Sequence, residues 1–210
     1  MIRVIAASLI ALALVLPAVV PAAEPQAALE RYFTEVETLS GAFQQTVRDE
    51  DGSVLEESRG TFAIQRPDRF DWVYAEPFEQ RIVGDGQRLW IHDPGLDQVT
   101  VQPIEQELGS GPATLLSGDM DRVTDAFSVN VDGDWVELTP RNEDWQLESA
   151  RLRLSDGVPQ EVIVQDGLGQ RTRLELDDLE TGVSFDDERF RFEPDDDTDV
   201  IEQGAGAVDG

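Results

Sequence analysis

Residues 65–74, QRPDRFDWVY, contain the pattern on which the fold assignment rests. Pro67 belongs at the end of a strand, because proline donates no hydrogen bond to a sheet, and it favours an extended Arg66. From residue 70 the chain alternates, so Phe70, Trp72 and the tyrosine two residues later share one face of a strand. The stretch predicts an aromatic β-strand entered through an arginine-proline turn. The alternative is an ordinary core strand with Arg66 at the surface.

Period-two alternation continues on both sides of this strand and predicts one antiparallel sheet. Asp-Gly pairs, which favour tight hairpin turns, separate several of the alternating runs. These runs cover residues 43–47, 61–64, 70–74, 81–91, 99–104, 127–131, 136–138, 147–154, 161–164 and 171–179. Consecutive hairpins of this kind give a meandering sheet.

Two segments predict helices that can cover one face of the sheet. The first has apolar residues at helical spacing and ends near Gly41; these residues are Leu29, Tyr32, Phe33, Val36 and Leu39. The second covers residues 112–126 in the middle of the chain. Either the helices fill the curved sheet, or the sheet leaves an apolar cavity beneath them. Periodicity alone leaves both outcomes open.

The first 22 residues predict a secretory signal peptide. A positive start with Arg3 precedes the uncharged apolar residues 4–16, and small residues precede a cleavage site before Ala23. The alternative, an N-terminal transmembrane helix, conflicts with Pro17 and Pro21. We therefore expect an exported protein with a single domain over residues 23–210, whose acidic tail is mobile from about residue 195.

Composition excludes several classes of function. The chain has 44 acidic residues against 16 basic ones, all of them Arg, and a net charge of −28. This balance argues against nucleic acid as a partner and against docking on anionic lipid. The lack of cysteine excludes disulfides, thiol catalysis and a lipid anchor on cysteine. His92, the single histidine, is expected to be structural, so we expect no catalytic residues, no metal and no cofactor. The acidic surface without lysine suggests a salty habitat.

Several motifs together resemble the LolA family of outer-membrane lipoprotein carriers. Besides residues 65–74, the resemblance rests on FQQ at 43–45, GTF at 60–62, residues 84–101, PATLL at 112–116, residues 165–172, FRFEP at 190–194 and DVI at 199–201. It covers nearly the whole chain after the predicted signal peptide. The sequence departs from the family at His92, where the family often has an aromatic residue.

The resemblance implies a mainly β fold, an unclosed antiparallel half-barrel of about eleven strands with a helical lid over an apolar cavity. It implies a monomeric periplasmic carrier that is not an enzyme and uses no cofactor. Such a carrier takes acylated lipoproteins from an inner-membrane lipoprotein-releasing ABC transporter. It delivers them to the outer-membrane receptor LolB.

The resemblance also implies roles for individual residues. Arg66 matches the family arginine whose guanidinium hydrogen-bonds lid-helix carbonyls and keeps the empty cavity shut. Phe70 and Trp72 are expected to line the cavity or its rim and to bind acyl chains. Alternation adds four further acyl-binding candidates, which are Phe62, Trp90, Leu115 and Leu116.

Two other functions remain open from the sequence. A LolA-like domain can instead sense or bind lipids or lipoproteins without delivering them. A secreted hydrolase with paired carboxylates belongs to a different class, but the many acidic residues make no particular pair informative.

Overall fold

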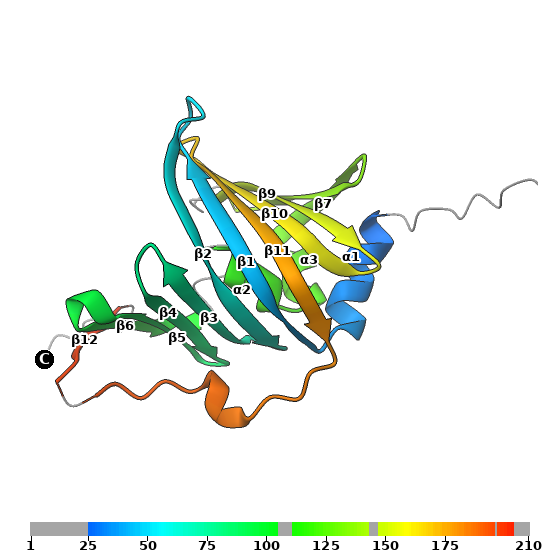
Figure 1. Cartoon of the computed structure of the whole chain (residues 1–210). Coiled ribbons are helices and arrows are strands. Elements are labelled where there is room, and N and C mark those ends of the chain that lie inside the picture. The colour runs from blue at the N-terminus through cyan, green and yellow to red at the C-terminus, as the bar shows by residue number, and fades with distance from the viewer. Residues whose placement is uncertain (1–24, 105–110, 143–146, 196, 204–210) are drawn as a thin grey trace, which may run out of the picture.

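The computed structural model describes residues 25–104, 111–142, 147–195 and 197–203. Twelve strands form a single sheet in the order β12-β6-β5-β4-β3-β2-β1-β11-β10-β9-β8-β7. Their bounds are β1 Thr38–Arg48, β2 Val54–Gln65, β3 Arg69–Glu76, β4 Gln80–Asp85, β5 Arg88–Asp93, β6 Gln98–Pro103, β7 Phe127–Asp132, β8 Trp135–Pro140, β9 Leu147–Ser155, β10 Val158–Asp166, β11 Arg171–Thr181 and β12 Asp199–Glu202. The sheet curves strongly but stays open between β12 and β7 (Figure 1).

The predicted meander is confirmed, because neighbouring strands pair antiparallel from β1 to β6 and from β7 to β11. The turn at Asp156-Gly157 shows the predicted hairpin chemistry, with φ of 51° and 78° at the two residues. Asp tolerates this left-handed backbone and Gly adopts it freely, so the strands reverse in a two-residue turn.

The expected unclosed sheet of about eleven strands is confirmed, whereas the end of one helix differs from the sequence prediction. The described residues form twelve strands, and the last of them, β12, pairs parallel to β6. The first helix, α1 (Pro25–Glu35), ends before the predicted Gly41. Leu39 and Gly41 instead belong to β1. Leu39 fits the helical spacing of the preceding apolar residues and also the alternation of the strand, so the spacing alone does not show where the helix ends.

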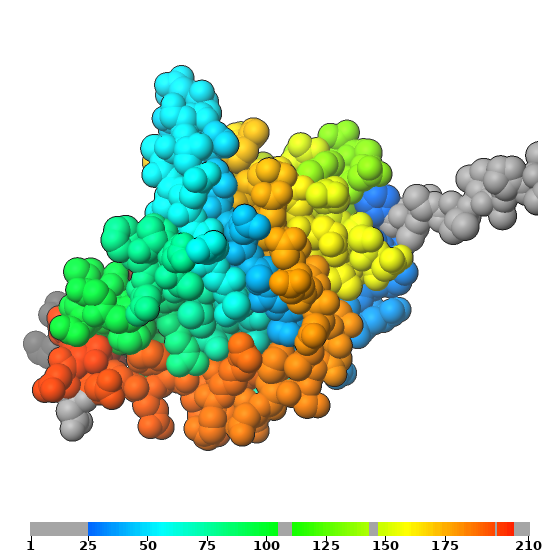
Figure 2. Space-filling view, in the orientation of Figure 1, coloured from blue at the N-terminus to red at the C-terminus, as the bar shows by residue number. Residues whose placement is uncertain are grey.

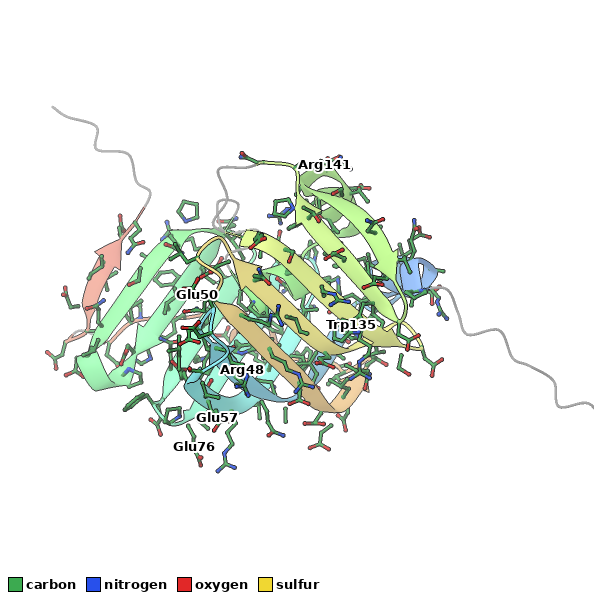
Figure 3. All side chains as sticks on the ribbon, turned by 90° about the horizontal axis from the view of Figure 1, so that it is seen from above. Arg48, Glu50, Glu57, Glu76, Trp135 and Arg141 are labelled. Atoms are coloured by element: carbon green, nitrogen blue, oxygen red, sulfur yellow. The ribbon has the colours of Figure 1, made fainter. Side chains whose placement is uncertain are left out.

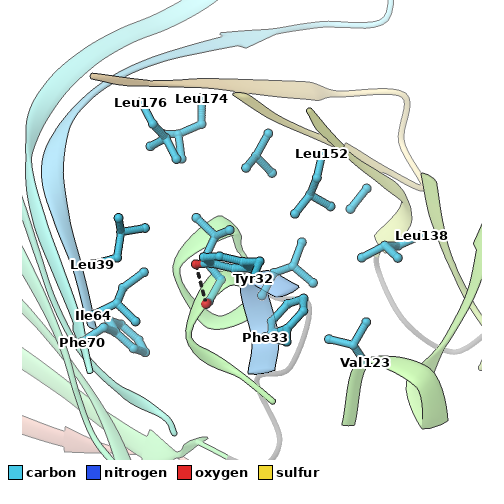
Figure 4. Packing of buried hydrophobic residues seen from close by; sticks show 14 of the residues in the cluster. Tyr32, Phe33, Leu39, Ile64, Phe70, Val123, Leu138, Leu152, Leu174 and Leu176 are labelled. Carbon is cyan, nitrogen blue, oxygen red and sulfur yellow. Dashed lines mark hydrogen bonds between the residues drawn. The ribbon is translucent and has the colours of Figure 1, made fainter. Parts of the chain in front are cut away.

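The α-helices of the described residues lie on the concave side of the sheet (Figure 1). Helix α1 packs on β7 to β10 and on α3 (Met120–Ala126), whereas α2 (Pro112–Ser117) contacts β2 and β3. Tyr32 and Phe33 of α1 lie among the leucine side chains of the sheet, including Leu152 and Leu174 (Figure 4). The half of the concave face beneath α1 is therefore a filled core.

The C-terminal segment, residues 183–195, covers the outer face of β3 and β4 (Figure 2). Its short 3-10 helix, η3 (Asp187–Phe190), buries Phe190, and Phe192 stacks on Trp90 with ring centroids 5.9 Å apart. Under the same segment, the buried Asp71 accepts a hydrogen bond of 2.7 Å from Arg81 Nε. Glu57 and Glu76 of β2 and β3 point outward from the sheet (Figure 3).

Residues 1–24, which include the predicted signal peptide, and residues 204–210 lie outside the described residues. No helix in the described part of the chain has the length and apolarity that a membrane crossing requires. Within those residues there is also no group of three or more side chains placed to hold a metal ion.

Candidate functional site

A cavity of about 410 Å³ lies on the concave face between β3 to β5 and helix α2. Its wall includes the apolar side chains of Phe70, Trp72, Ile82, Leu89 and Ile91. The start of α2, residues 111–114, forms the side opposite this wall, and residues of β1, β6, β11 and the β10–β11 turn complete the lining. The concave face is therefore filled under α1 and hollow beside α2.

The aromatic wall is held in place by close packing along β3. Trp72 stacks on Phe62 with ring centroids 4.8 Å apart, and Phe43 packs on Trp72 at the same distance. Phe70 lies over Gly84, its partner on β4, where an added Cβ would come within 2.5 Å of the ring. Because Gly84 leaves that space, the Phe70 side chain lies flat against the sheet with its other side toward the cavity.

The candidate acyl-binding residues fall into two groups. Phe70 and Trp72 line the cavity, and their contact with acyl chains stays a prediction. Phe62, Leu115 and Leu116 are buried in the adjoining core and do not line it. They support the wall and the helix from behind.

The cavity-facing position predicted for Trp90 was wrong. Trp90 pairs with Val83, which pairs with Asp71, so all three lie on the outer face of the sheet. Its indole Nε1 donates to Asp85 at 2.9 Å. The neighbouring Leu89 and Ile91 face the cavity instead. The strand was identified correctly, but its aromatic residue packs under the C-terminal segment, which alternation within one strand cannot show.

Arg66 ties the two helical regions to the end of β2. Its Nη1 donates to the carbonyl of Val36, just after α1, at 3.1 Å, and its Nη2 donates to the carbonyl of Leu116 in α2 at 2.9 Å. Carbonyls at helix ends lack partners within the helix, and a planar guanidinium can reach two of them at once. The structure thus places Arg66 between one carbonyl within α2 and one just beyond α1, and its role as a latch stays a prediction.

Two further contacts hold α2 over the cavity, and the sequence alone did not reveal them. The Tyr32 hydroxyl also donates to the Leu116 carbonyl, at 3.0 Å (dashed line in Figure 4). Burial raises the pKa of Tyr32, against the opposing effect of Arg66, so the hydroxyl stays protonated and remains a donor. The Asp68 backbone N–H donates to the carbonyl of Ser117, and the Asp68 carboxylate pairs with Arg122.

A second pocket, which we name the mouth pocket, opens beside the cavity and has a volume of about 710 Å³. It is lined by parts of β1 and β2, the β3–β4 turn and the β5–β6 turn. Gln45 and Tyr74 line both the cavity and the mouth pocket, and the Tyr74 hydroxyl donates to Gln45 Oε1 at 3.1 Å. Burial, with the nearby Glu56 carboxylate, raises the pKa of Tyr74 to about 12. The tyrosine therefore stays neutral between the two spaces.

The comparisons with known proteins agree with this architecture. The family model described as "Outer membrane lipoprotein carrier protein LolA" matches residues 34–193. The chain is 48% identical to an outer-membrane lipoprotein carrier protein of Alkalilimnicola ehrlichii, over 91% of this chain and 90% of the relative. It is 47% identical to the protein of the same name from Halorhodospira halophila, over 93% of this chain and 94% of the relative.

Solved structures agree on the fold. A LolA superfamily protein from Nitrosomonas europaea superposes with a TM-score of 0.51 at 15% identity, covering 81% of this chain and 99% of that one. The sequence match extends from the end of α1 to the C-terminal segment and so includes the cavity, the Arg66 contacts and the mouth pocket. The chain belongs to the LolA family of outer-membrane lipoprotein carrier proteins.

Proposed function

We propose that this protein carries acylated lipoproteins across the periplasm, with the acyl chains held in the cavity between β3 to β5 and α2. It would receive them from an inner-membrane lipoprotein-releasing ABC transporter and deliver them to an outer-membrane receptor of the LolB type. The observation that supports this most directly is the aromatic and aliphatic wall of the 410 Å³ cavity beneath a helix held by polar ties. Such a site binds hydrocarbon by burial alone and breaks no bond.

The polar ties suit a carrier that must also release its cargo. Each buried CH₂ contributes about 0.8 kcal/mol, so full burial of one long acyl chain would exceed about 10 kcal/mol. A site that held every chain so tightly would not release it without an energy source. We infer that the chains are only partly buried and that opening the Arg66 contacts offsets some of the binding free energy.

In this proposal Arg66 acts as a latch between the empty and loaded states. Loading moves α2 away from β3 and breaks the hydrogen bonds from Arg66 and Tyr32 to Leu116. Transfer to the receptor lets these bonds form again, which favours release. Phe70 and Trp72 contact the acyl chains directly, whereas Phe62, Leu115 and Leu116 support the wall and the helix.

The charge of the protein fits transfer through protein partners. A chain of net charge −28 is repelled by anionic lipid, so an open apolar cavity does not attach it to a bilayer. We propose export through the segment 1–22, which places the mature protein in the compartment between the two membranes.

The decisive experiment is lipoprotein release from spheroplasts or inner-membrane vesicles that contain the matched transporter. The purified mature protein should bring acylated lipoprotein into the soluble fraction as a one-to-one complex. A second incubation with the matched receptor should then empty the carrier. Release without transfer would support a lipid-binding sensor, and no release by the folded protein would contradict the carrier function.

A further inference from the structure

The mouth pocket adjoins the cavity and differs from it in chemistry. The two spaces meet at Tyr74 and Gln45, which line both. Whereas the cavity wall is apolar, the mouth pocket has three carboxylates in its lining, those of Glu56, Glu79 and Asp93, and no arginine. A ligand that extends from the cavity past Tyr74 and Gln45 therefore meets a negatively charged pocket.

These carboxylates have no cationic partner in the part of the chain that the structure describes. The ion pairs there use other acids, such as Glu76 with Arg59 and Glu161 with Arg153 and Arg173. Asp93 instead accepts a hydrogen bond of 3.0 Å from the backbone of Gly95, which positions its side chain at the β5–β6 turn. Three unpaired carboxylates around one hollow attract positive charge.

A buried hydroxyl in the same lining indicates a ligand independently of the charge. Ser58 is only 7% exposed, lines the mouth pocket, and its Oγ has no hydrogen-bond partner among the described residues. Buried polar atoms normally have a partner, so this hydroxyl is suited to a peptide group that enters the pocket. Phe78 and Leu96, 82% and 68% exposed, flank the opening and add apolar contact area.

We propose that the mouth pocket binds the peptide segment adjoining the acyl-bearing residue of the cargo and favours segments that carry Lys or Arg. This inference rests on the proposed function, because it needs the acyl chains in the cavity. In this proposal the peptide joined to those chains passes Tyr74 and Gln45 to reach solvent. Glu56, Glu79 and Asp93 then face its side chains, and Ser58 faces its backbone.

Two synthetic diacylated lipopeptides test this proposal, each with the same acyl groups on an N-terminal cysteine. One continues with serine and four lysines, and the other with serine and four glutamates. Binding to the mature protein is measured by competition with a fluorescent lipopeptide, below the concentration at which micelles form. Because an exposed ion pair contributes little individually, we expect the lysine peptide to bind about tenfold more tightly at low salt through three such pairs.

Matched variants separate the mouth pocket from the general acidity of the protein. The first combines Glu56→Gln, Glu79→Gln and Asp93→Asn, and the control combines three exposed or half-exposed acids elsewhere on the sheet, Glu57→Gln, Glu137→Gln and Glu180→Gln. Both lose three negative charges. The preference for lysine should fall to about twofold in the first variant and remain in the control. Thermal unfolding of both variants checks that they are folded.

A third variant, Ser58→Ala, tests the hydroxyl separately. It should weaken the binding of both lipopeptides by about threefold and leave the preference for lysine unchanged, because the lost hydrogen bond is to the peptide backbone. Equal binding of the two peptides to the native protein, or an equal loss of preference in both triple variants, would overturn the inference while leaving the carrier function in place. If neither lipopeptide bound the native protein, the carrier function itself would be contradicted.

Discussion

Arg66 and Tyr32 donate to the same acceptor, the carbonyl oxygen of Leu116, and the Arg66 guanidinium carbon lies 3.9 Å from the centroid of the Tyr32 ring. The tyrosine thus orients the arginine by stacking and shares its hydrogen bond to α2. A cation over an aromatic face gains electrostatic attraction in addition to the hydrogen bonds. The latch that we propose is therefore a pair of residues, one from α1 and one from the end of β2.

Replacing Tyr32 with Phe should loosen α2 without unfolding the protein. The ring still fills the core and still stacks on Arg66, but one of the two hydrogen bonds to Leu116 is lost, at a cost of about 1 kcal/mol. We expect amide exchange in residues 115–117 to become about fivefold faster by hydrogen exchange, with little change in α1. An unchanged exchange rate in α2 would mean that the tyrosine hydroxyl does not hold the helix.

Arg66→Leu should leave the fold intact and favour the open state, so that cargo is taken up but poorly released to the receptor. The side chain loses both carbonyl partners while keeping its apolar contacts. The comparison variant Arg66→Lys retains the charge but not the planar fork and should be impaired as well. Transfer from purified loaded carrier to receptor measures the effect, and normal transfer by Arg66→Leu would rule out the latch.

Phe70→Glu should weaken cargo uptake, because a carboxylate in the apolar wall opposes burial of an acyl chain. Phe70 is fully buried, so Ile91→Glu, at a half-buried position of the same wall, guards against a simple loss of folding. The control Val131→Glu adds the same charge at an exposed strand position away from the cavity. Uptake of a fluorescent acyl ligand should fall at least tenfold in the first two and remain in the control. Undiminished uptake in both cavity variants would exclude this wall from the site.

Tyr74 should make the protein sensitive to alkali. Its pKa is raised to about 12, chiefly by burial, from about 10 in an unfolded chain. Its stabilising contribution is therefore complete below pH 10 and is lost as the pH rises from 10 through 12, by on the order of 3 kcal/mol. Urea unfolding from pH 8 to pH 11.5 should show this decline, and Tyr74→Phe should flatten it. A parallel decline in the variant would assign the effect to other groups.

Glu161 should stabilise the far side of the sheet above acidic pH. Burial alone would raise its pKa, but hydrogen bonds from Arg173 and Arg153 outweigh burial and hold the pKa below its usual range. The contribution is present above about pH 4.5 and is lost as the pH falls through the lowered pKa. Glu161→Gln should therefore have a lower free energy of unfolding than the native protein at pH 7, and this difference should become smaller toward pH 3. A difference that did not depend on pH would contradict this assignment.

The sequence predicted the curved sheet well because the signal for each strand is local. Alternation identified β3, and Asp156-Gly157 marked a hairpin from two neighbouring residues. The helix end at Glu35 was missed because Val36 and Leu39 continue both helical and strand spacing. Strand β12 was missed because its four exposed residues pair with β6, about a hundred residues earlier, and long-range pairing leaves no local pattern.

The candidate site was predicted only in part for the same reason. Arg66 and Phe70 stood in a specific motif, so their place could be anticipated. Tyr32 was predicted only as one of the apolar residues on a helix face. Nothing in the local sequence indicates that its hydroxyl donates to a carbonyl 84 residues away. Trp90 was predicted on the wrong face of its strand. A strand that is covered on both sides has apolar residues on both faces, so alternation does not show which face is the concave one.

The C-terminal segment has a mechanical consequence for a hollow protein. Strands β3 to β5 have the cavity on one side, and a single sheet layer over a void is readily deformed. Phe190 and Phe192 pack on the outer face of that layer and make it more rigid. The ion pairs of Asp71 with Arg81 and Arg189 hold the C-terminal segment against the strands. In the proposed loading step, the more weakly supported part is then α2, so we expect a filled cavity to move the helix and to leave the wall unchanged.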